Sequence, residues 1–310
     1  MLTFILIFLI PLGIGEIITR TLMGKRLLFE TIEKDGFYRF KPSQEGWYLY
    51  NVLAPARINN VGARGEDVDL DQWHQKQKFF FFGDSFTFGY ALQEDETIPY
   101  YFMREGNLSP TEVLNFGNSA FGVYHMMRTY DLYQQWMRPR DTIVMIIIED
   151  DFYRPLKDYQ RTKLKDFLWR IREHSSFIAW FITASQQVAG RGVADFLNHL
   201  KKEKLSTDYN QRKDIFREDG PMLVDFYKKV RQNGQQLVFV FYEYELSDYS
   251  KKAQDFCRKN GLQCVAKIYN LFEPLRQRRL PLVCGYDFLH PSMYSNQVVS
   301  KGIWTWLAQN

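Results

Sequence analysis

The 310-residue chain has little cysteine and little histidine, with three of the first and five of the second. Cys257, Cys264 and Cys284 are an odd number without CxxC spacing, so the sequence indicates neither a disulfide framework nor a zinc knuckle. The P-loop motif, HExxH and a GxGxxG after a strand are all missing, so no metal or nucleotide cofactor is expected. A charge excess is lacking too. The 40 basic residues face 36 acidic ones, and the net charge of +4 is too small to indicate a nucleic-acid partner.

The rest of the composition is that of an ordinary globular protein, 45% hydrophobic, 25% charged and 17% aromatic. The mean hydropathy is -0.36. A chain of 310 residues is long enough for one large or two small domains with a sizeable core. These values exclude a disordered tail protein, a collagen-like fibre and a protein with many membrane spans.

The N-terminal segment departs from this average, because residues 1–15 carry no charge before Glu16. The apolar run is a little shorter than the ~20 residues of an ideal membrane span. It lacks the basic region and cleavage site of a removable signal peptide, so we expect an uncleaved membrane anchor over residues 1–22, with a buried core helix as the alternative. We favour an extracytoplasmic location, but the orientation stays open. Under the positive-inside rule, the main domain would be held in the cytoplasm by the basic residues that follow: Arg20, Lys25, Arg26 and Lys34.

From about residue 77 onward, short apolar runs alternate with longer amphipathic ones. This pattern predicts an α/β domain over residues 77–310, with a central parallel sheet covered by helices on both faces. Residues 23–76 are a predicted N-terminal extension with few periodic signals. The half-charged helical stretch near 157–204 is predicted to be an insertion, which could serve as a lid. The expected strands are Phe79–Phe82, Glu112–Asn115, Thr142–Ile148, Gln236–Tyr242 and Gln263–Ile268. The expected helices include Pro221–Gln232, Lys251–Asn260 and Asn296–Leu307.

Polar residues follow these runs at the edge where the carboxyl ends of parallel strands would meet. Ser85 comes just after the first run, and Asp287 and His290 stand before the last helix. This is the order expected of a nucleophile, the residue that orients its base, and the base. The serine lies in a GDS context rather than GxSxG, which excludes the nucleophile elbow of α/β-hydrolases.

The other four histidines have simpler interpretations. His74 lies in a polar stretch and is expected to be solvated, and His174 and His199 fall in the charged insertion and are expected to be exposed. His125 follows the stretch VLNFGNSAFG, which contains the second apolar run. We expect it to be a packed surface histidine, and the alternative is that it lines the pocket.

Four blocks of the sequence together resemble the SGNH (GDSL-type) hydrolases: FFFFGDSFTFG, VLNFGNSAFG, the strand ending in EDDF, and DFLHPS. The resemblance covers roughly residues 78–310 and is loose between about 156 and 218. It implies a three-layer α/β/α, flavodoxin-like sandwich, with Ser85 as nucleophile, His290 as general base and Asp287 orienting the imidazole. The stretch INNVGARG at Ile58–Gly65 is similar to a lead-in of membrane-anchored bacterial members.

The oxyanion hole is where the sequence departs from this pattern. The family builds it from the N–H of the nucleophile, the N–H of a glycine in the second block and an asparagine side chain in the third. The glycine position falls on Ala120, which keeps a backbone N–H, and the asparagine position falls on Asp150. An asparagine would stabilise the oxyanion by roughly 3–4 kcal/mol, whereas an ionised carboxylate would repel it by roughly 5 kcal/mol at an effective dielectric near ~20. Asp150 is therefore buried and protonated beside Glu149 and Asp151, or turned elsewhere, or a sign of weak or absent catalysis.

These residues predict a serine esterase that acts on O-acyl esters, carbohydrate esters first among them, through an acyl-Ser85 intermediate. A sugar hydroxyl as acceptor in place of water would make the protein a polysaccharide O-acyltransferase. The rival from another class is an SGNH-fold binding protein with little or no catalysis, which Asp150 favours and the set Ser85, Asp287 and His290 opposes. The expected partners are an acyl-ester small molecule or polysaccharide and, through the N-terminal segment, a membrane.

Overall fold

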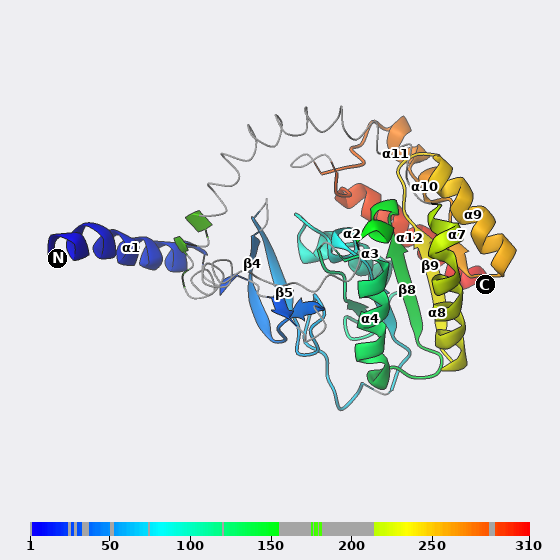
Figure 1. Cartoon of the computed structure of the whole chain (residues 1–310), viewed down its shortest axis with the longest axis horizontal. Coiled ribbons are helices and arrows are strands. Elements are labelled where there is room, and N and C mark those ends of the chain that lie inside the picture. Colours follow the sequence, from blue (N-terminus) through cyan, green and yellow to red (C-terminus); the bar gives the residue numbers. More distant parts are fainter. Residues whose placement is uncertain are drawn as a thin grey trace.

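The computed structural model describes residues 2–23, 26–27, 30–32, 37–49, 53–73, 75–119, 121–154, 175, 177–178, 180–181, 214–284 and 289–310. Its centre is a parallel sheet with the strand order β10-β9-β8-β6-β7 (Figure 1). Every residue of β6 and β8 is buried, which explains why these strands read as continuous apolar runs. The five strands are β6 (Phe79–Phe82), β7 (Val113–Asn115), β8 (Thr142–Ile147), β9 (Gln236–Phe241) and β10 (Cys264–Val265).

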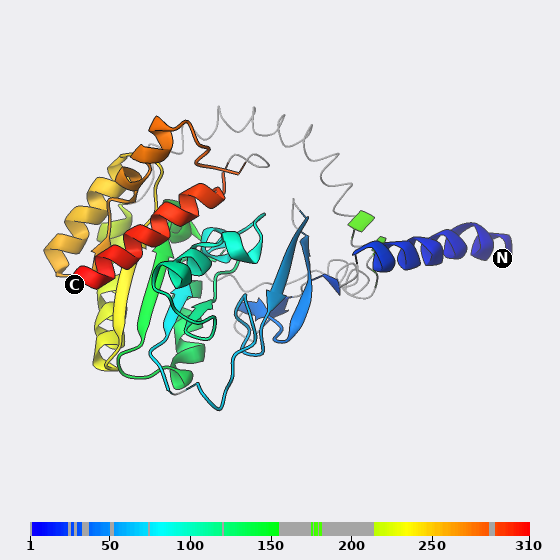
Figure 2. The same ribbon diagram turned by 180° about the vertical axis from the view of Figure 1, so that it is seen from behind.

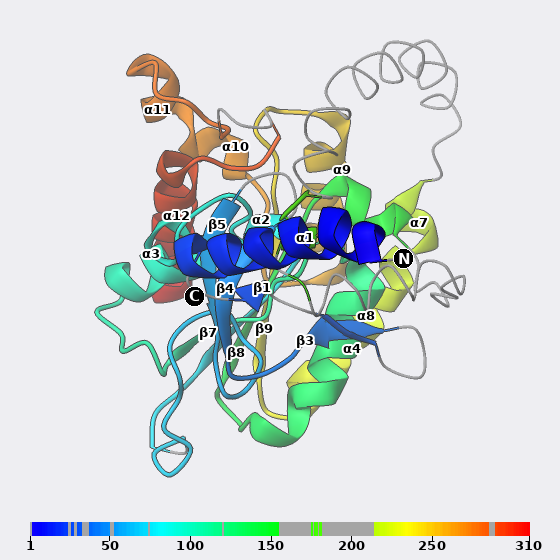
Figure 3. The same cartoon turned by 90° about the vertical axis from the view of Figure 1, so that its left-hand side faces the viewer.

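Different helices cover the two faces of the sheet, because successive side chains of a strand point to opposite faces. Phe80 and Phe82 of β6 enter one core, and Phe79 and Phe81 enter the other. Figure 3 views the layers edge-on: α4 (Val123–Tyr133) and α8 (Gly220–Gln232) lie on one side of the strands, and α3 (Ile98–Glu105) and α12 (Met293–Gln309) lie on the other. Figure 2, the view from behind, shows α12 in front of the sheet. The first core contains residues of α4, α8 and α9 (Asp248–Asn260), and the second contains residues of α3, α10 (Ile268–Leu271) and α12. The predicted three-layer sandwich with a central parallel sheet is confirmed.

Most element boundaries agree with the sequence prediction. The first four strands agree within one residue at each end, whereas the last is shortened to the two residues of β10. Helices α9 and α12 begin three residues earlier than predicted because Ser247 and Ser292 cap their N-termini with their hydroxyl groups. The shorter helical elements are α2 (Ser85–Phe88), α7 (Ile215–Glu218), α11 (Glu273–Gln277), η1 (Glu94–Glu96), η2 (Gln134–Trp136) and η3 (Glu149–Tyr153).

The N-terminal extension contains strands that its sequence does not indicate. Strands β4 (Gln44–Leu49) and β5 (Leu53–Ile58) form an antiparallel hairpin, in which Gln44 pairs with Ile58 at the open end. Strand β1 (Arg26–Leu27) pairs with β4 in parallel. Arg64 joins this region to the main sheet, because its backbone N–H donates to Asn115 O of the edge strand β7 at 2.7 Å. The extension also contains β2 (Glu30–Ile32) and β3 (Tyr38–Phe40).

Helix α1 (Leu2–Met23) covers the predicted membrane anchor and contains Pro11. Among the described residues, no helix combines the length and the apolar character that crossing a membrane requires, so the predicted transmembrane helix is not found. The alternative of a buried core helix is wrong, because Ile17 is 67% exposed. Glu16 brings charge to the second half of α1, where it pairs with Arg20 and accepts a hydrogen bond from Ser175 Oγ at 2.8 Å. The rest of the predicted insertion at 157–204 lies outside the described residues, apart from 177–178 and 180–181.

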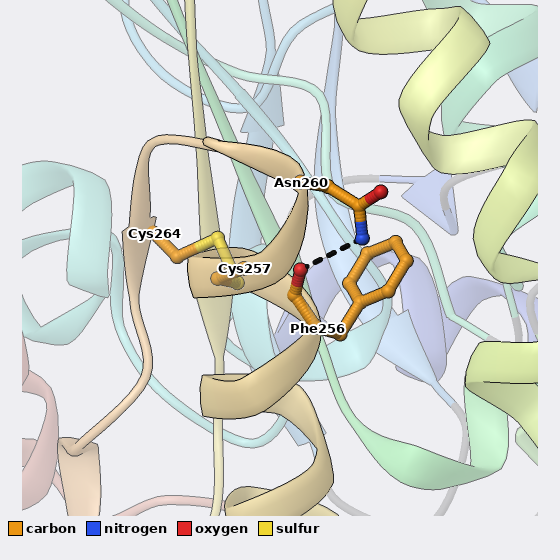
Figure 4. Close-up of a disulfide and its surroundings, with 4 residues drawn as sticks. All are labelled: Phe256, Cys257, Asn260 and Cys264. Atoms are coloured by element: carbon orange, nitrogen blue, oxygen red, sulfur yellow. Dashed lines mark hydrogen bonds between the residues drawn. A yellow bond between two sulfur atoms is a disulfide. The ribbon is translucent and has the colours of Figure 1, made fainter.

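Cys257 and Cys264 form a disulfide, which corrects the expectation from the cysteine count (Figure 4). Gly261 ends α9 in the left-handed conformation, at φ 62°, and the chain turns back so that Cys264 in β10 faces Cys257 in α9. Cys284 is the third cysteine, and its thiol donates to Pro291 O. A cross-link around so short a loop stabilises the fold by about 2–3 kcal/mol. Here it ties the short edge strand β10 to α9.

Candidate functional site

Ser85 lies at the carboxyl end of β6, as the first residue of α2. Asp84 caps this helix, since its Oδ1 accepts a hydrogen bond from Phe86 N at 2.9 Å. The turn requires Gly83, because a Cβ there would lie 1.9 Å from Thr87 Oγ1. In the sheet, β6 has β7 on one side and β8 on the other. The next strand along the chain, β7, is added on one side of β6, and the strands after it are added on the opposite side, so the direction of strand addition reverses at β6. Open α/β sheets bind their ligands at this point.

Ser85 and His290 are brought together by the fold although 205 residues separate them. The distance between Ser85 Oγ and His290 Nε2 is 2.8 Å, which is within reach for proton transfer. The imidazole packs against the rings of Phe86 and Tyr90, with centroid separations of 5.5 and 4.3 Å. These contacts hold the ring in place, and the pair has the geometry of a nucleophile and its general base.

The other predicted site residues are placed less completely. Asp287 and Ala120 lie outside the described residues, so their roles as orienting residue and oxyanion donor stay predictions. Asp150 lies in η3 and is exposed, so the burial that would have favoured its protonation is not found. The buried carboxyl group of this turn belongs to its neighbour Asp151, which is 0% exposed.

A single guanidinium group lies between two buried carboxyl groups close to Ser85. Arg154 Nη1 donates to Asp84 Oδ2 at 3.0 Å and to Asp151 Oδ1 at 2.7 Å. The other oxygen of Asp151 accepts a hydrogen bond from Ile148 N at 3.0 Å. Burial raises the pKa of Asp151 well above its ordinary value, and the charge of Asp84 raises it further while that of Arg154 opposes the shift. The site therefore holds two buried carboxyl groups and one guanidinium group, and one of these carboxyl groups belongs to Asp84, the residue before Ser85.

His125 is buried rather than at the surface, which corrects the sequence prediction. Its side chain is 6% exposed and stacks on Phe121 with a centroid separation of 5.1 Å. Its Nδ1 accepts a hydrogen bond from Gly122 N at 3.2 Å. Burial lowers the pKa of His125 to about 4, and the nearby charge of Arg154 adds to the shift. The ring is neutral at pH 7 and braces the loop that follows β7.

Arg64, from the lead-in stretch, supports α2, the helix that begins with Ser85. It is buried, and its guanidinium donates to Phe88 O at 2.7 Å, to Gly89 O at 2.8 Å and to Leu92 O at 2.7 Å. These carbonyls include the last of α2 and the residue that ends it. A buried arginine that satisfies backbone carbonyls around α2 fixes where that helix sits.

Arg154 is the site residue that the sequence pattern does not indicate. The available signal is weak: an arginine follows closely on the acidic run Glu149–Asp151. Such a pattern is typical of many solvated turns. Only the folded chain shows that Asp84, from a distant part of the sequence, completes the cluster.

No protein-family model and no curated protein matches this sequence. Among solved structures, the chain is similar to a member of the lipolytic protein G-D-S-L family from Veillonella parvula, with 11% identity over 76% of this chain and 100% of that chain and a TM-score of 0.43. It is also similar to a catalytic mutant of an acetylxylan esterase from Geobacillus stearothermophilus, with 14% identity over 74% of this chain and 93% of that chain and a TM-score of 0.42. By its own architecture, this chain is a three-layer α/β protein with a paired serine and histidine at the carboxyl edge of its sheet.

Proposed function

We propose that the protein is an SGNH-type serine hydrolase that cleaves O-acyl esters. The observation that carries the proposal is the 2.8 Å contact between Ser85 Oγ and His290 Nε2, at the edge of the sheet where ligands bind. Three of the four sequence blocks support the proposal, because each lies at the carboxyl end of a different strand of the sheet. The GDS block follows β6, the second block follows β7 and the third follows β8.

In the first half-reaction, Ser85 Oγ attacks the carbonyl carbon of the ester while His290 Nε2 takes the hydroxyl proton. The bond between that carbon and the alcohol oxygen then breaks, and the imidazolium returns the proton to the leaving alcohol. In the second half-reaction water attacks acyl-Ser85, His290 takes a proton from the water, and the acid leaves as Ser85 regains its proton. Asp287 would orient the imidazole, and the N–H groups of Ser85 and Ala120, with Asp150, would face the oxyanion.

We further propose a carbohydrate ester as the substrate, on the strength of the resemblance to membrane-anchored SGNH proteins. Transfer of the acyl group to a sugar hydroxyl would use the same acyl-Ser85 intermediate, so product analysis distinguishes an esterase from an O-acyltransferase. For an esterase, we expect the release of free carboxylic acid to stay the same when a polysaccharide acceptor is added.

Covalent labelling by a fluorophosphonate probe tests the proposed function. The wild-type chain should be labelled at Ser85, and Ser85→Ala should abolish labelling and ester hydrolysis, because the substitution removes the hydroxyl group that His290 contacts. Ser109→Ala is the matched control: its hydroxyl contacts Glu112 just before β7, away from the carboxyl edge, so labelling should persist. If the wild type itself is not labelled, the chain is better described as a binding protein of this fold.

We also propose that the protein works outside the cytoplasm and in contact with a membrane. Disulfides such as Cys257–Cys264 persist in oxidising compartments and are rare in the cytosol. Helix α1 offers apolar side chains that a membrane could cover, among them Ile14 at 52% and Ile17 at 67% exposed. The basic residues after α1 argue for the opposite side of the membrane, so the location needs a direct measurement.

Alkylation of cysteines in intact cells, followed by fractionation, provides that measurement. The full chain should sediment with membranes, a variant without residues 1–22 should not, and Cys257 and Cys264 should resist alkylation until a reductant is added. Cys284 is the internal reference, because it should react after denaturation with or without reductant. Alkylation of all three thiols without reductant would place the protein in the cytoplasm, and full-length protein in the soluble fraction would remove the membrane contact.

A further inference from the structure

Arg154 connects three loops that follow three different strands of the sheet. Its Nη1 lies 3.0 Å from Asp84 Oδ2 after β6, 3.0 Å from Phe121 O after β7, and 2.7 Å from Asp151 Oδ1 after β8. The first of these loops carries the nucleophile. The other two contain the positions from which the remaining oxyanion donors are predicted to come. One nitrogen atom of Arg154 therefore joins the three loops that carry Ser85 and the predicted oxyanion donors.

Asp84 transmits this placement to the nucleophile. Its Oδ1 accepts the hydrogen bond from Phe86 N that begins α2, and its Oδ2 lies 3.5 Å from Ser85 Oγ and 3.0 Å from Arg154. A shift of the Asp84 carboxylate would move the first turn of α2, and Ser85 with it, relative to His290. Misplacement of a reacting group by about 1 Å can lower the rate about 100-fold.

The cluster depends on its cation, because the side chains of Asp84 and Asp151 are 1% and 0% exposed. Removing one member of a buried ion cluster leaves the others without compensation and is strongly destabilising. Without Arg154, the two carboxyl groups would have to move apart or take up protons. Either change would release the loops after β6 and β8 from each other.

We propose that Arg154 is a positioning residue of the active site, which holds the Asp84 turn, the loop after β7 and the Asp151 turn in register for attack by Ser85. The inference rests on the serine-hydrolase function proposed above. Arg154 acts on the reaction through Asp84 and not on the substrate, so its loss should lower kcat and leave KM nearly unchanged. All three contacts come from one nitrogen, so a lysine ammonium, with three N–H donors on one nitrogen, should replace it in part.

The test compares Arg154→Gln and Arg154→Lys with the wild-type full chain, in hydrolysis of p-nitrophenyl acetate and in the rate of fluorophosphonate labelling. We expect Arg154→Gln to lower kcat and the labelling rate about 100-fold with KM within about threefold, and Arg154→Lys to stay within about tenfold of the wild type. Arg258→Gln is the matched control, since Arg258 also pairs with an aspartate three residues earlier, Asp255 at 2.8 Å, but lies exposed on α9. It should leave both rates unchanged.

The outcomes separate the two proposals. A wild type that is not labelled contradicts the serine-hydrolase function itself. A labelled wild type with Arg154→Gln equally fast, or with Arg154→Lys as slow as Arg154→Gln, overturns the positioning role alone. If Arg154→Gln does not fold, the double variant Arg154→Gln/Asp151→Asn takes its place, because it removes one of the two buried charges and keeps the hydrogen-bond acceptor for Ile148 N.

Discussion

Replacement of His290 by alanine is expected to lower kcat for a simple acyl ester about 10⁴- to 10⁶-fold. In the proposed mechanism the imidazole takes the Ser85 proton across 2.8 Å, and without it the hydroxyl is a weak nucleophile at neutral pH. The loss should fall on kcat rather than on KM, because His290 acts in the transition state. Steady-state hydrolysis of p-nitrophenyl acetate measures it, and the fluorophosphonate labelling rate should fall in parallel.

The control for this variant is His125→Asn, at the other described histidine near the site. His125 has its hydrogen-bond contact with Gly122 N rather than with Ser85, and an asparagine Oδ1 can accept the same hydrogen bond. Its kcat should stay within about threefold of the wild type, since the contact between Ser85 and His290 is untouched. If His290→Ala retains a tenth or more of the wild-type kcat, His290 is not the general base, and the Ser85–His290 contact is a structural one.

The sheet could be predicted from the sequence because its strands are buried on both faces. Phe79–Phe82 and Thr142–Ile147 are continuous apolar runs, and helices with clear caps separate the later strands. The shortest strands of the extension, β1 and β2, could not be predicted, because strands of two and three residues have no room for a periodic signal and depend on their partners. The disulfide escaped prediction for a related reason: a cysteine pair is decided by which chain segments meet, and an odd count hides it.

The candidate site, like the fold, can be predicted from the sequence only in part. The order of Ser85 and His290, each at the carboxyl edge of a parallel sheet, was enough to predict their meeting. The cluster of Asp84, Asp151 and Arg154 was not predictable, because its members come from different loops and their charges are compensated only in the folded chain. The spacing of the third block predicts that Asp150 occupies the oxyanion position. It gave no information on burial, which falls on the next residue instead.

Replacement of Asp150 by asparagine is expected to raise kcat about 10- to 100-fold at neutral pH. An amide N–H aimed at the oxyanion is worth about 100-fold or more in related sites, and the substitution also removes a negative charge from the third loop. The exposed position of Asp150 in η3 lets solvent weaken the repulsion, so the gain should come mostly from the new donor. Hydrolysis of p-nitrophenyl acetate at pH 7 measures the change, and KM should move little.

Two further variants separate the donor from the charge. Asp150→Ala removes the carboxylate without adding a donor and should raise kcat less than Asp150→Asn does. Glu149→Gln removes the neighbouring charge of the same turn and should have a small effect only. If Asp150→Asn, Asp150→Ala and the wild type turn over at the same rate, Asp150 does not face the oxyanion. The hole would then be completed by backbone N–H groups, and the departure from the family asparagine would no longer argue for a catalytically weak protein.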